Sequence, residues 1–236
     1  MHNKKKLGII GGMGSIATAY FFDRLVALTP AIIDQEYIET VVHNNTAIPD
    51  RTAGILMGKT SPIDELNRSV ALLNDFGADY ILMACITSHY FVEELQMNSK
   101  AAIINIIKET VTMVSKAYPD IGKIGVIAST GAVKLELFQK ALAAHDLESV
   151  ILSDNEQRTY FTEPIYDPWG IKAGFITGKP KERLCRAVNI LREKGAELVI
   201  AGCSELPLVL KDTTTEIPVI DAIDIGLLRA IRLCLN

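Results

Sequence analysis

The chain has 236 residues, of which 49% are hydrophobic and 22% are charged, a usage typical of globular proteins rather than of disordered or fibrous ones. This length allows one large domain or two smaller ones. The 24 Lys and Arg residues against 28 Asp and Glu residues give a formal net charge of −4. Such a balance supplies no electrostatic footprint for nucleic acid or an anionic membrane, so we expect neither as a partner.

The cysteines and the N-terminus indicate a reduced, cytoplasmic setting. The four cysteines are too few for a disulfide scaffold and lack the CxxC spacing of a zinc site. Two of them, Cys185 and Cys234, lie in helical stretches and are expected to be buried thiols without a role. The apolar run Leu7–Ile10 that follows the basic N-terminus is much shorter than a signal peptide core or a membrane span.

Short apolar runs alternate with segments of helical periodicity along the whole chain. The runs are typical of buried strands in a parallel sheet and cover residues 7–10, 37–42, 80–83, 124–127, 150–152, 198–200 and 219–220. The predicted helices cover residues 16–27, 62–76, 103–118, 133–144, 181–194 and 222–235. This alternation predicts an α/β fold.

An internal repeat divides the chain into two similar halves. Residues 6–14 (KLGIIGGMG) align with residues 123–131 (KIGVIASTG), 117 positions later. Residues 77–85 (GADYILMAC) align with residues 195–203 (GAELVIAGC), 118 positions later. The two matches at nearly one offset predict two pseudo-symmetric domains, each a parallel sheet flanked by helices, with a turn after the first strand and a cysteine after a later one.

The boundary between the domains is expected in a short connection, because no Ser/Pro-rich linker is present. The best candidate is the segment 118–122 (YPDIG). The strand and helix predicted over 219–235 have no counterpart in the second half and are expected to complete the first domain. The predicted division is therefore 1–117 plus 215–236 for the first domain and 118–214 for the second.

The cysteines that end the repeated segments, Cys85 and Cys203, are the candidate catalytic groups. Parallel sheets bind ligands outside the carboxyl ends of their strands, and both thiols are expected at that edge. If the halves face one another about a pseudo-twofold axis, the two thiols flank a single cleft. A thiol has a pKa of about 8.5, which a helix N-terminus lowers. One thiol can then remove a proton from a carbon while the other delivers a proton to its opposite face, without a cofactor.

Five motifs are specific in combination: residues 11–18 (GGMGSIAT), 44–52 (NNTAIPDRT), 84–91 (ACITSHYF), 166–172 (YDPWGIK) and 202–207 (GCSELP). On these motifs the chain resembles the aspartate/glutamate racemase family, the cofactor-independent two-cysteine amino-acid racemases, and most of all its aspartate racemase branch. The resemblance covers essentially the whole chain. It implies the interconversion of L- and D-aspartate or glutamate without pyridoxal phosphate or a metal, and it implies a homodimer.

The resemblance also implies roles for residues around the two thiols. Cys85 and Cys203 would be the acid–base residues, each serving one enantiomer. Met13 and Gly14 would line the pocket.

The remaining implied roles concern the substrate's two carboxylates. Thr87 and Ser204 would hold the α-carboxylate, and Arg51 and Lys172 would receive the distal carboxylate of an acidic amino acid. A guanidinium grips a carboxylate with two parallel hydrogen bonds, so Arg51 favours an acidic substrate over an apolar one.

Two departures from the family pattern leave alternatives open. Where the family usually has Cys-Asn-Thr-Ala-His, residues 85–89 read Cys-Ile-Thr-Ser-His, so Ile86 replaces a carboxamide at the substrate. Where the family usually has Cys-Thr-Glu, residues 203–205 read Cys-Ser-Glu, which keeps the hydroxyl. The alternatives are a two-cysteine racemase or isomerase with another substrate, and a catalytically silent protein that binds acidic amino acids. The choice between aspartate and glutamate stays open as well.

Several of these residues also fit plain structural roles. Met13 can fill space under the turn, and Arg51 and Lys172 can be surface charges. His89 can tune the thiol four residues before it or serve a structural purpose. Glu205 can orient a donor or cap the following helix.

Overall fold

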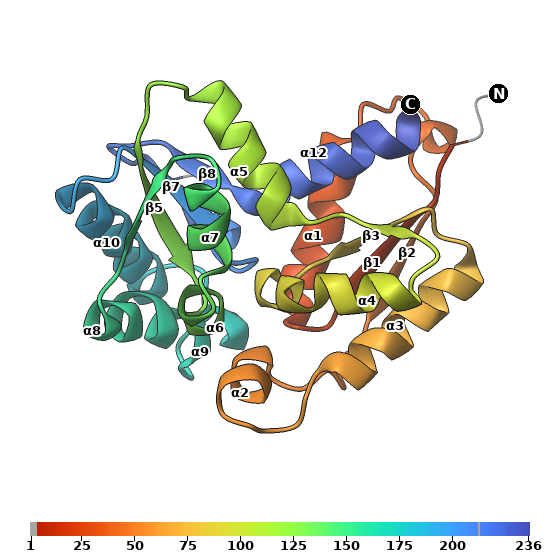
Figure 1. Cartoon of the computed structure of the whole chain (residues 1–236), viewed down its shortest axis with the longest axis horizontal. Helices are drawn as coiled ribbons and strands as arrows, with labels where there is room; N and C mark the ends of the chain where they lie inside the picture. Colours follow the sequence, from red (N-terminus) through yellow and green to blue (C-terminus); the bar gives the residue numbers. More distant parts are fainter. Residues whose placement is uncertain (1–3, 212) are drawn as a thin grey trace. The chain divides into compact units, whose positions relative to one another are not determined.

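A computed structural model describes residues 4–211 and 213–236 of the chain (Figure 1). The chain separates into two compact units. The first comprises the N-terminal part up to Glu109 together with Ile223–Asn236, and the second is Thr110–Ala222. Among the described residues, none of the helices combines the length and the apolar composition needed to span a bilayer.

The first unit contains a four-stranded parallel sheet with the strand order β2-β1-β3-β4. Its strands are β1 (Leu7–Gly11), β2 (Thr40–Asn44), β3 (Tyr80–Met83) and β4 (Ala102–Ile103). The central strand β1 pairs with both β2 and β3, with Leu7 opposite Thr40 on one side and Tyr80 on the other. All five residues of β1 are buried, as expected for a strand that is covered on both faces of a parallel sheet.

Helices cover both faces of this first sheet. In Figure 1, α3 and α4 lie on one face and α1 lies on the other, the arrangement that right-handed crossovers produce for this strand order. Helix α1 is joined to α12 by Arg24, whose Nε donates to Oδ1 of Asp224 at 2.9 Å. The helices of this part of the chain are α1 (Ser15–Leu28), η1 (Asp34–Glu36), α2 (Arg51–Leu56), α3 (Ile63–Phe76), η2 (Ile86–Phe91), α4 (Val92–Asn98) and α12 (Ala222–Leu235), and α5 (Ile106–Ala117) begins in this unit and continues into the second.

The second unit repeats the same sheet with the order β6-β5-β7-β8, again parallel throughout. Its strands are β5 (Lys123–Ala128), β6 (Glu148–Ile151), β7 (Leu198–Gly202) and β8 (Val219–Asp221). Its helices are α6 (Thr130–Lys134), α7 (Leu137–Ala143), α8 (Asp154–Gln157), the π-helix η3 (Arg158–Thr162), α9 (Glu163–Tyr166), η4 (Ile171–Ala173), α10 (Lys179–Glu193) and α11 (Pro207–Leu210). The two halves that the sequence repeat predicts therefore have the same strand order and the same parallel pairing.

Equivalent glycines end the helices that lead into β3 and β7. Gly77 follows α3 with a φ of +77°, and Gly195 follows α10 with a φ of +94°. Both backbones are in the left-handed region, which glycine adopts without a Cβ penalty. The two units therefore enter the strand before each candidate cysteine through the same kind of turn.

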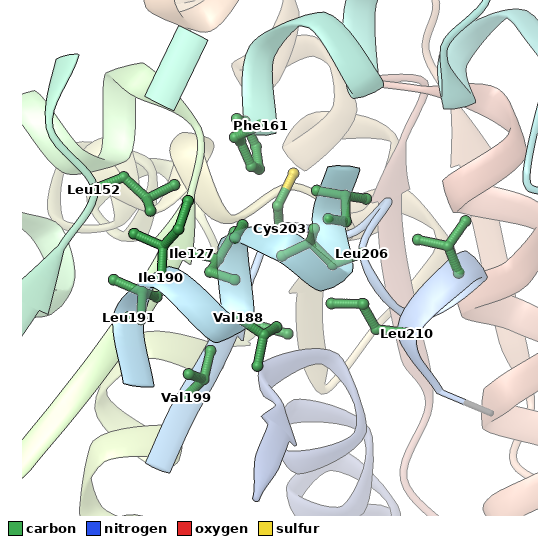
Figure 2. Close-up of a cluster of buried hydrophobic side chains, with 14 of the residues drawn as sticks. Ile127, Leu152, Phe161, Val188, Ile190, Leu191, Val199, Cys203, Leu206 and Leu210 are labelled. Carbon is green, nitrogen blue, oxygen red and sulfur yellow. The ribbon is translucent and has the colours of Figure 1, made fainter. Parts of the chain in front are cut away.

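Each unit has its own hydrophobic core beside its sheet. The core of the first unit includes Met13 and Cys85 together with side chains from α3 and β3. In the second unit the core includes Phe161, Cys203 and Leu206, with side chains from α10 and β7. Figure 2 shows Cys203 inside this second cluster, with its sulfur toward Phe161. Both candidate thiols are therefore largely shielded from solvent.

The predicted α/β architecture with two parallel sheets is confirmed, and the local differences have identifiable causes. The strand predicted over 37–42 begins at Thr40 because a 3-10 turn, Asp34–Glu36, precedes it. The helix predicted over 103–118 begins at Ile106 because Ala102–Ile103 pair as the edge strand β4. The helix predicted over 133–144 is two helices, α6 and α7, separated at Glu136, whose φ is +58°.

The division of the chain differs from the one expected, 1–117 plus 215–236 and 118–214. Strand β8 pairs with β7 and so belongs to the second sheet, not to the first domain. The boundary before the second unit falls after Glu109, inside α5, rather than in the loop at 118–122. A helix that continues past a boundary leaves no compositional signal, and strand pairing is a long-range choice that hydrophobicity alone does not reveal.

Candidate active site

In the first unit, the turn after β1 and Cys85 after β3 lie at the same edge of the sheet. Strands β1 and β3 are neighbours, and the chain leaves them in opposite directions along the strand order β2-β1-β3-β4. Such a point is the topological switch point, where parallel sheets bind ligands. The N–H of Ala84 donates to the carbonyl of Ile10 at 2.9 Å, which continues the pairing up to Cys85.

The turn after β1 has a conformation that only glycine fits. Gly12 has a φ of +89°, and a Cβ there would lie 2.2 Å from the backbone carbonyl group of Asn45. Thr18 closes the turn, because its Oγ1 accepts from the N–H of Gly12 at 3.0 Å and donates to the carbonyl of Gly14 at 2.8 Å. Gly14 is the N-cap residue of α1, and Met13 between the two glycines is 3% exposed.

Arg51 is a buried arginine bound to this turn. Its Nη2 donates to the carbonyl of Met13 at 2.8 Å, and its Nη1 donates to the carbonyl of Pro49 at 3.1 Å. Arg51 is the first residue of α2, which Asp50 caps by accepting from the N–H of Ala53 at 2.7 Å. The structure thus places the guanidinium against the predicted pocket residue Met13 and excludes the reading of Arg51 as a surface charge, since only 8% of the residue is exposed.

The segment after β3 holds Cys85 by its main chain. Oγ of Ser88 and Nδ1 of His89 both donate to the carbonyl of Cys85, at 2.6 and 3.1 Å. Cys85 itself precedes η2, in which Ile86 and Thr87 are buried. Because a carbonyl only accepts, His89 must carry a proton on Nδ1. Burial lowers the pKa of His89 from 6.5 to about 4, so the ring is neutral near pH 7.

In the second unit, β5 and β7 form the equivalent switch point. Cys203 follows β7, as Cys85 follows β3. The loop after β5 brings Ser129 and Thr130 to this edge, where Ser129 caps α6 by accepting from the N–H of Ala132 at 3.1 Å. Thr130 aligns with Met13 in the repeat. Sequence reasoning did not single out Ser129 and Thr130, although the alignment of the two halves contains the signal that finds them.

Cys203 belongs to a chain of polar contacts inside the second unit. Its Sγ donates to Oε2 of Glu205 at 3.1 Å, and Oγ of Ser204 donates to the same oxygen at 3.1 Å. The other oxygen of Glu205, Oε1, is paired with Nζ of Lys172 at 2.7 Å. Burial and the carboxylate of Glu205 together raise the pKa of the Cys203 thiol well above its usual value.

Lys172 reaches this cluster from η4, in the loop that precedes α10. Its side chain is 24% exposed, whereas that of Glu205 is 3% exposed. The ammonium also lies 5.4 Å from the ring centre of Tyr166. Trp169 in the same loop is covered by a different cation, Lys179, at 3.8 Å. The loop thus sets Lys172 at the solvent side of the Cys203 cluster.

The structure therefore brings the predicted residues together in two sets. The set in the first unit is Met13, Gly14, Arg51, Cys85, Ile86 and Thr87. The set in the second unit is Lys172, Cys203 and Ser204. Two residues had an undecided role. Glu205 joins the second set through its hydrogen bond from Cys203, and His89 contacts the first set by donating to the main-chain carbonyl of Cys85.

Of the two remaining cysteines, both of which were expected to be buried, only Cys234 is buried. Cys234 lies on α12, is 1% exposed, and has a pKa raised to about 12, chiefly by burial. Cys185 lies on α10 and packs, partly buried, against the core of the second unit. The described part of the chain contains no group of three or more His, Cys, Asp or Glu side chains arranged to hold a metal ion.

A separate cavity of about 220 Å³ opens in the second unit at the carboxyl ends of β5 and β6. Its rim carries an ion pair between Lys134 and Asp154 at 2.6 Å. The lining residues are Thr130, Val133, Lys134, Glu136, Gln139, Ile151, Leu152, Asp154 and Gln157. None of the residues predicted for the site is among them.

The sequence is similar to those of known amino-acid racemases. The profile of a protein family described as Asp/Glu/Hydantoin racemase matches residues 10–230. The chain is 25% identical over 225 residues to the broad specificity amino-acid racemase RacX of Bacillus subtilis (strain 168), covering 92% of each protein.

Solved structures are similar in fold to the whole chain. An aspartate racemase of Picrophilus torridus superimposes with a TM-score of 0.83 and 26% identity, over 97% of this chain and 94% of that one. An aspartate racemase homologue of Pyrococcus horikoshii OT3 superimposes with a TM-score of 0.75 and 24% identity, over 98% of this chain and 100% of that one.

Proposed function

Because the chain belongs to the Asp/Glu/hydantoin racemase family, we propose that it interconverts the L and D forms of aspartate or glutamate without pyridoxal phosphate or a metal. One observation carries the proposal: the two units have the same strand order, and each places a cysteine after the strand beside its first strand. These are Cys85 after β3 and Cys203 after β7. A two-base inversion at one carbon needs an acid and a base on opposite faces, and a pair of thiols is suited to both roles.

In the proposed reaction, Cys85 and Cys203 act on opposite faces of the substrate's Cα. A thiolate takes the Cα proton, so that the C–H bond breaks, an S–H bond forms, and the electron pair passes into the α-carboxylate. The other thiol then gives its proton to the opposite face. Donors aimed at the carboxylate oxygens stabilise the charge that develops there, and Thr87 and Ser204 are the proposed side chains for this purpose.

We propose an acidic substrate because two cationic side chains, the buried Arg51 and the partly buried Lys172, belong to the two sets of predicted residues. Arg51 is a buried guanidinium whose Nη1 and Nη2 bind backbone carbonyls at the turn after β1, and it is the proposed partner of the distal carboxylate. Lys172 is the more exposed partner in its ion pair with Glu205 and is the second proposed contact of that carboxylate. Met13 and Gly14 complete the proposed pocket at the turn after β1. We also expect a cytoplasmic homodimer, as in the family that the sequence resembles.

A second candidate function follows from Ile86. This residue is 2% exposed and lies next to Cys85, where the family usually has a carboxamide. An apolar group there removes a donor to the substrate's carboxylate, which favours an altered substrate or binding of an acidic amino acid without turnover. Calorimetric binding of aspartate without Cα-proton exchange would support the latter.

The test is Cα-proton exchange in D2O. L-aspartate, D-aspartate, L-glutamate and D-glutamate are incubated separately with the reduced protein, and the Cα-proton signal is followed by NMR together with optical rotation. We expect loss of the signal with inversion for at least one pair. Absence of exchange with all four, from folded protein, would contradict the proposal.

Variants of single cysteines test the two-base scheme. Cys85→Ser and Cys203→Ser are each expected to lose racemisation, because a hydroxyl is a much weaker acid than a thiol. The matched control is Cys185→Ser, at a half-buried cysteine of α10 outside the proposed site, which should retain the rate. Full activity in either of the first two variants would exclude the scheme.

A further inference from the structure

The hydrogen bonds around Glu205 make the two candidate thiols chemically different. Glu205 is 2% exposed, and its carboxylate has three partners within the second unit: Lys172, Cys203 and Ser204. A buried carboxylate is costly unless it is paired and hydrogen-bonded, and here both oxygens are used. The thiol of Cys203 can donate to Glu205 only while it keeps its proton.

We propose that Glu205 is a positioning residue that holds Cys203 as a protonated thiol in the resting protein, so that Cys203 is the proton donor and Cys85 the first proton acceptor. This inference rests on the proposed racemase function. It gives the two thiols different protonation states in the resting protein. The resting protein can therefore deprotonate only the enantiomer whose Cα–H bond faces Cys85.

The electrostatic surroundings of Cys203 support this assignment. The charged groups that act on its thiol are the carboxylate of Glu205, which disfavours a thiolate, and the ammonium of Lys172, which favours one. The hydrophobic cluster that contains Cys203 includes Phe161 and Leu206, which carry no charge (Figure 2). Burial adds to the effect of Glu205, since a low-dielectric site disfavours the charged form of a thiol.

Lys172 is the residue of this cluster through which a bound substrate can alter the charge around Cys203. The lysine is the partner nearer to solvent, so an anionic substrate can reach its ammonium while Glu205 stays buried. In the proton-transfer step the S–H bond of Cys203 breaks, the proton goes to the carbanion at Cα, and the electron pair stays on sulfur. The thiolate then has the backbone N–H of Glu205 as a hydrogen-bond donor.

The experiment measures the ionisation of Cys203 directly, without turnover. The full-length protein is labelled with cysteine carrying carbon-13 at Cβ, and the resonance that disappears in Cys203→Ser is followed by NMR against pH. In the wild type we expect Cys203 to ionise above pH 9, higher than the same resonance in urea. A wild-type midpoint at or below that of the unfolded chain would overturn the proposal, and in this arm the Cys203→Ser variant serves only to assign the resonance.

Two variants separate a positioning role from a structural one. Glu205→Gln should lower the ionisation midpoint of Cys203 by about one pH unit or more, because the like charge is removed while Lys172 remains. Glu205→Asp retains the carboxylate and should restore a high midpoint. Lys172→Met should leave the thiol protonated up to the highest pH reached. An unchanged or raised midpoint in Glu205→Gln would overturn the proposal.

The racemisation assay gives an independent readout. Because a thiolate at Cys203 has no proton to deliver, the high-pH limb of kcat/KM in Glu205→Gln should move down in pH together with the NMR midpoint. If the wild type shows no proton exchange with any acidic amino acid, the proposed function fails while the titration still decides the role of Glu205. If racemisation occurs and the titration does not shift, only the role of Glu205 fails.

Discussion

Nη2 of Arg51 donates to the carbonyl oxygen of Met13 at 2.8 Å, across 38 positions of the chain. The bond joins the first residue of α2 to the turn after β1, which carries the predicted pocket residues. Nη1 of the same guanidinium donates to the carbonyl of Pro49. Arg51 therefore organises the turn and, in the proposed function, faces the substrate's distal carboxylate as well.

Arg51→Lys is expected to weaken both stability and substrate binding. One ammonium cannot reproduce the two-pronged grip of a guanidinium, and a buried carbonyl left without its donor costs about 1–3 kcal/mol. Urea denaturation should show this loss, and KM for the acidic substrate should rise. The control is Arg158→Lys, at an arginine whose side chain is 78% exposed. If Arg51→Lys is as stable as the wild type, the guanidinium does not stabilise the turn. If KM is unchanged, Arg51 does not bind the substrate.

Gly12→Ala should be far more harmful than the same change at a glycine in open space. At Gly12 the φ is +89° and a Cβ would lie 2.2 Å from backbone atoms of Asn45. We expect a loss of about 3 kcal/mol or more, because backbone on both sides must move. Gly58→Ala is the matched control, since Gly58 has a φ of +63° with nothing within 4 Å of a Cβ. It should cost only about 1–2 kcal/mol, the conformational penalty alone. Equal effects of the two changes on the urea midpoint would argue against the close approach.

The folded protein should lose stability as the pH falls from 6.5 to 4, through His89. Its pKa is about 4 in the folded chain and 6.5 when unperturbed. In this range the unfolded chain binds more protons, so protonation favours unfolding. The stability is fully present above pH 6.5 and is lost as the pH approaches 4, by about 3 kcal/mol from this residue. Urea unfolding at several pH values measures the loss.

The control for His89 is His89→Asn, which keeps an N–H near the position of Nδ1 but does not titrate. Carboxylates elsewhere contribute equally to the acid sensitivity of both proteins, so the difference between them isolates the histidine. The variant should show a shallower dependence on pH between 4 and 6.5. Parallel curves for the two proteins would exclude a neutral, buried His89.

Ile86→Asn tests whether the apolar residue beside Cys85 limits activity on acidic amino acids. A hydrogen bond to a charged group contributes about 1.5–3 kcal/mol, so a carboxamide that reaches the substrate should raise kcat/KM by roughly 10- to 100-fold. Ile86→Val is the control that keeps the site apolar and should change the rate little. If the asparagine variant binds and turns over the four acidic enantiomers as the wild type does, Ile86 does not determine the substrate range.

Local signals in the sequence were sufficient for much of the fold. Strand β3 and helix α12 have the predicted bounds, because an apolar run and a helical period are properties of consecutive residues. The repeat located Cys85 and Cys203 at equivalent strand ends, because the two halves can be aligned from their residues alone. The bounds of the short helices η2 and α11 near these cysteines were not predicted, because a single turn carries too little periodicity to locate its ends.

What the amino-acid sequence settled, then, was the α/β class, the two parallel sheets and the residue types at the strand ends, all of which follow from neighbouring residues. Folding in three dimensions decided which strand β8 joins, that Arg51 reaches the carbonyl of Met13, and that Glu205 lies between Lys172 and Cys203. Apart from the contact between Cys203 and Glu205, which are two positions apart, these contacts join segments separated along the chain. Their geometry depends on how whole helices and strands pack, which no local pattern of hydrophobicity or charge contains.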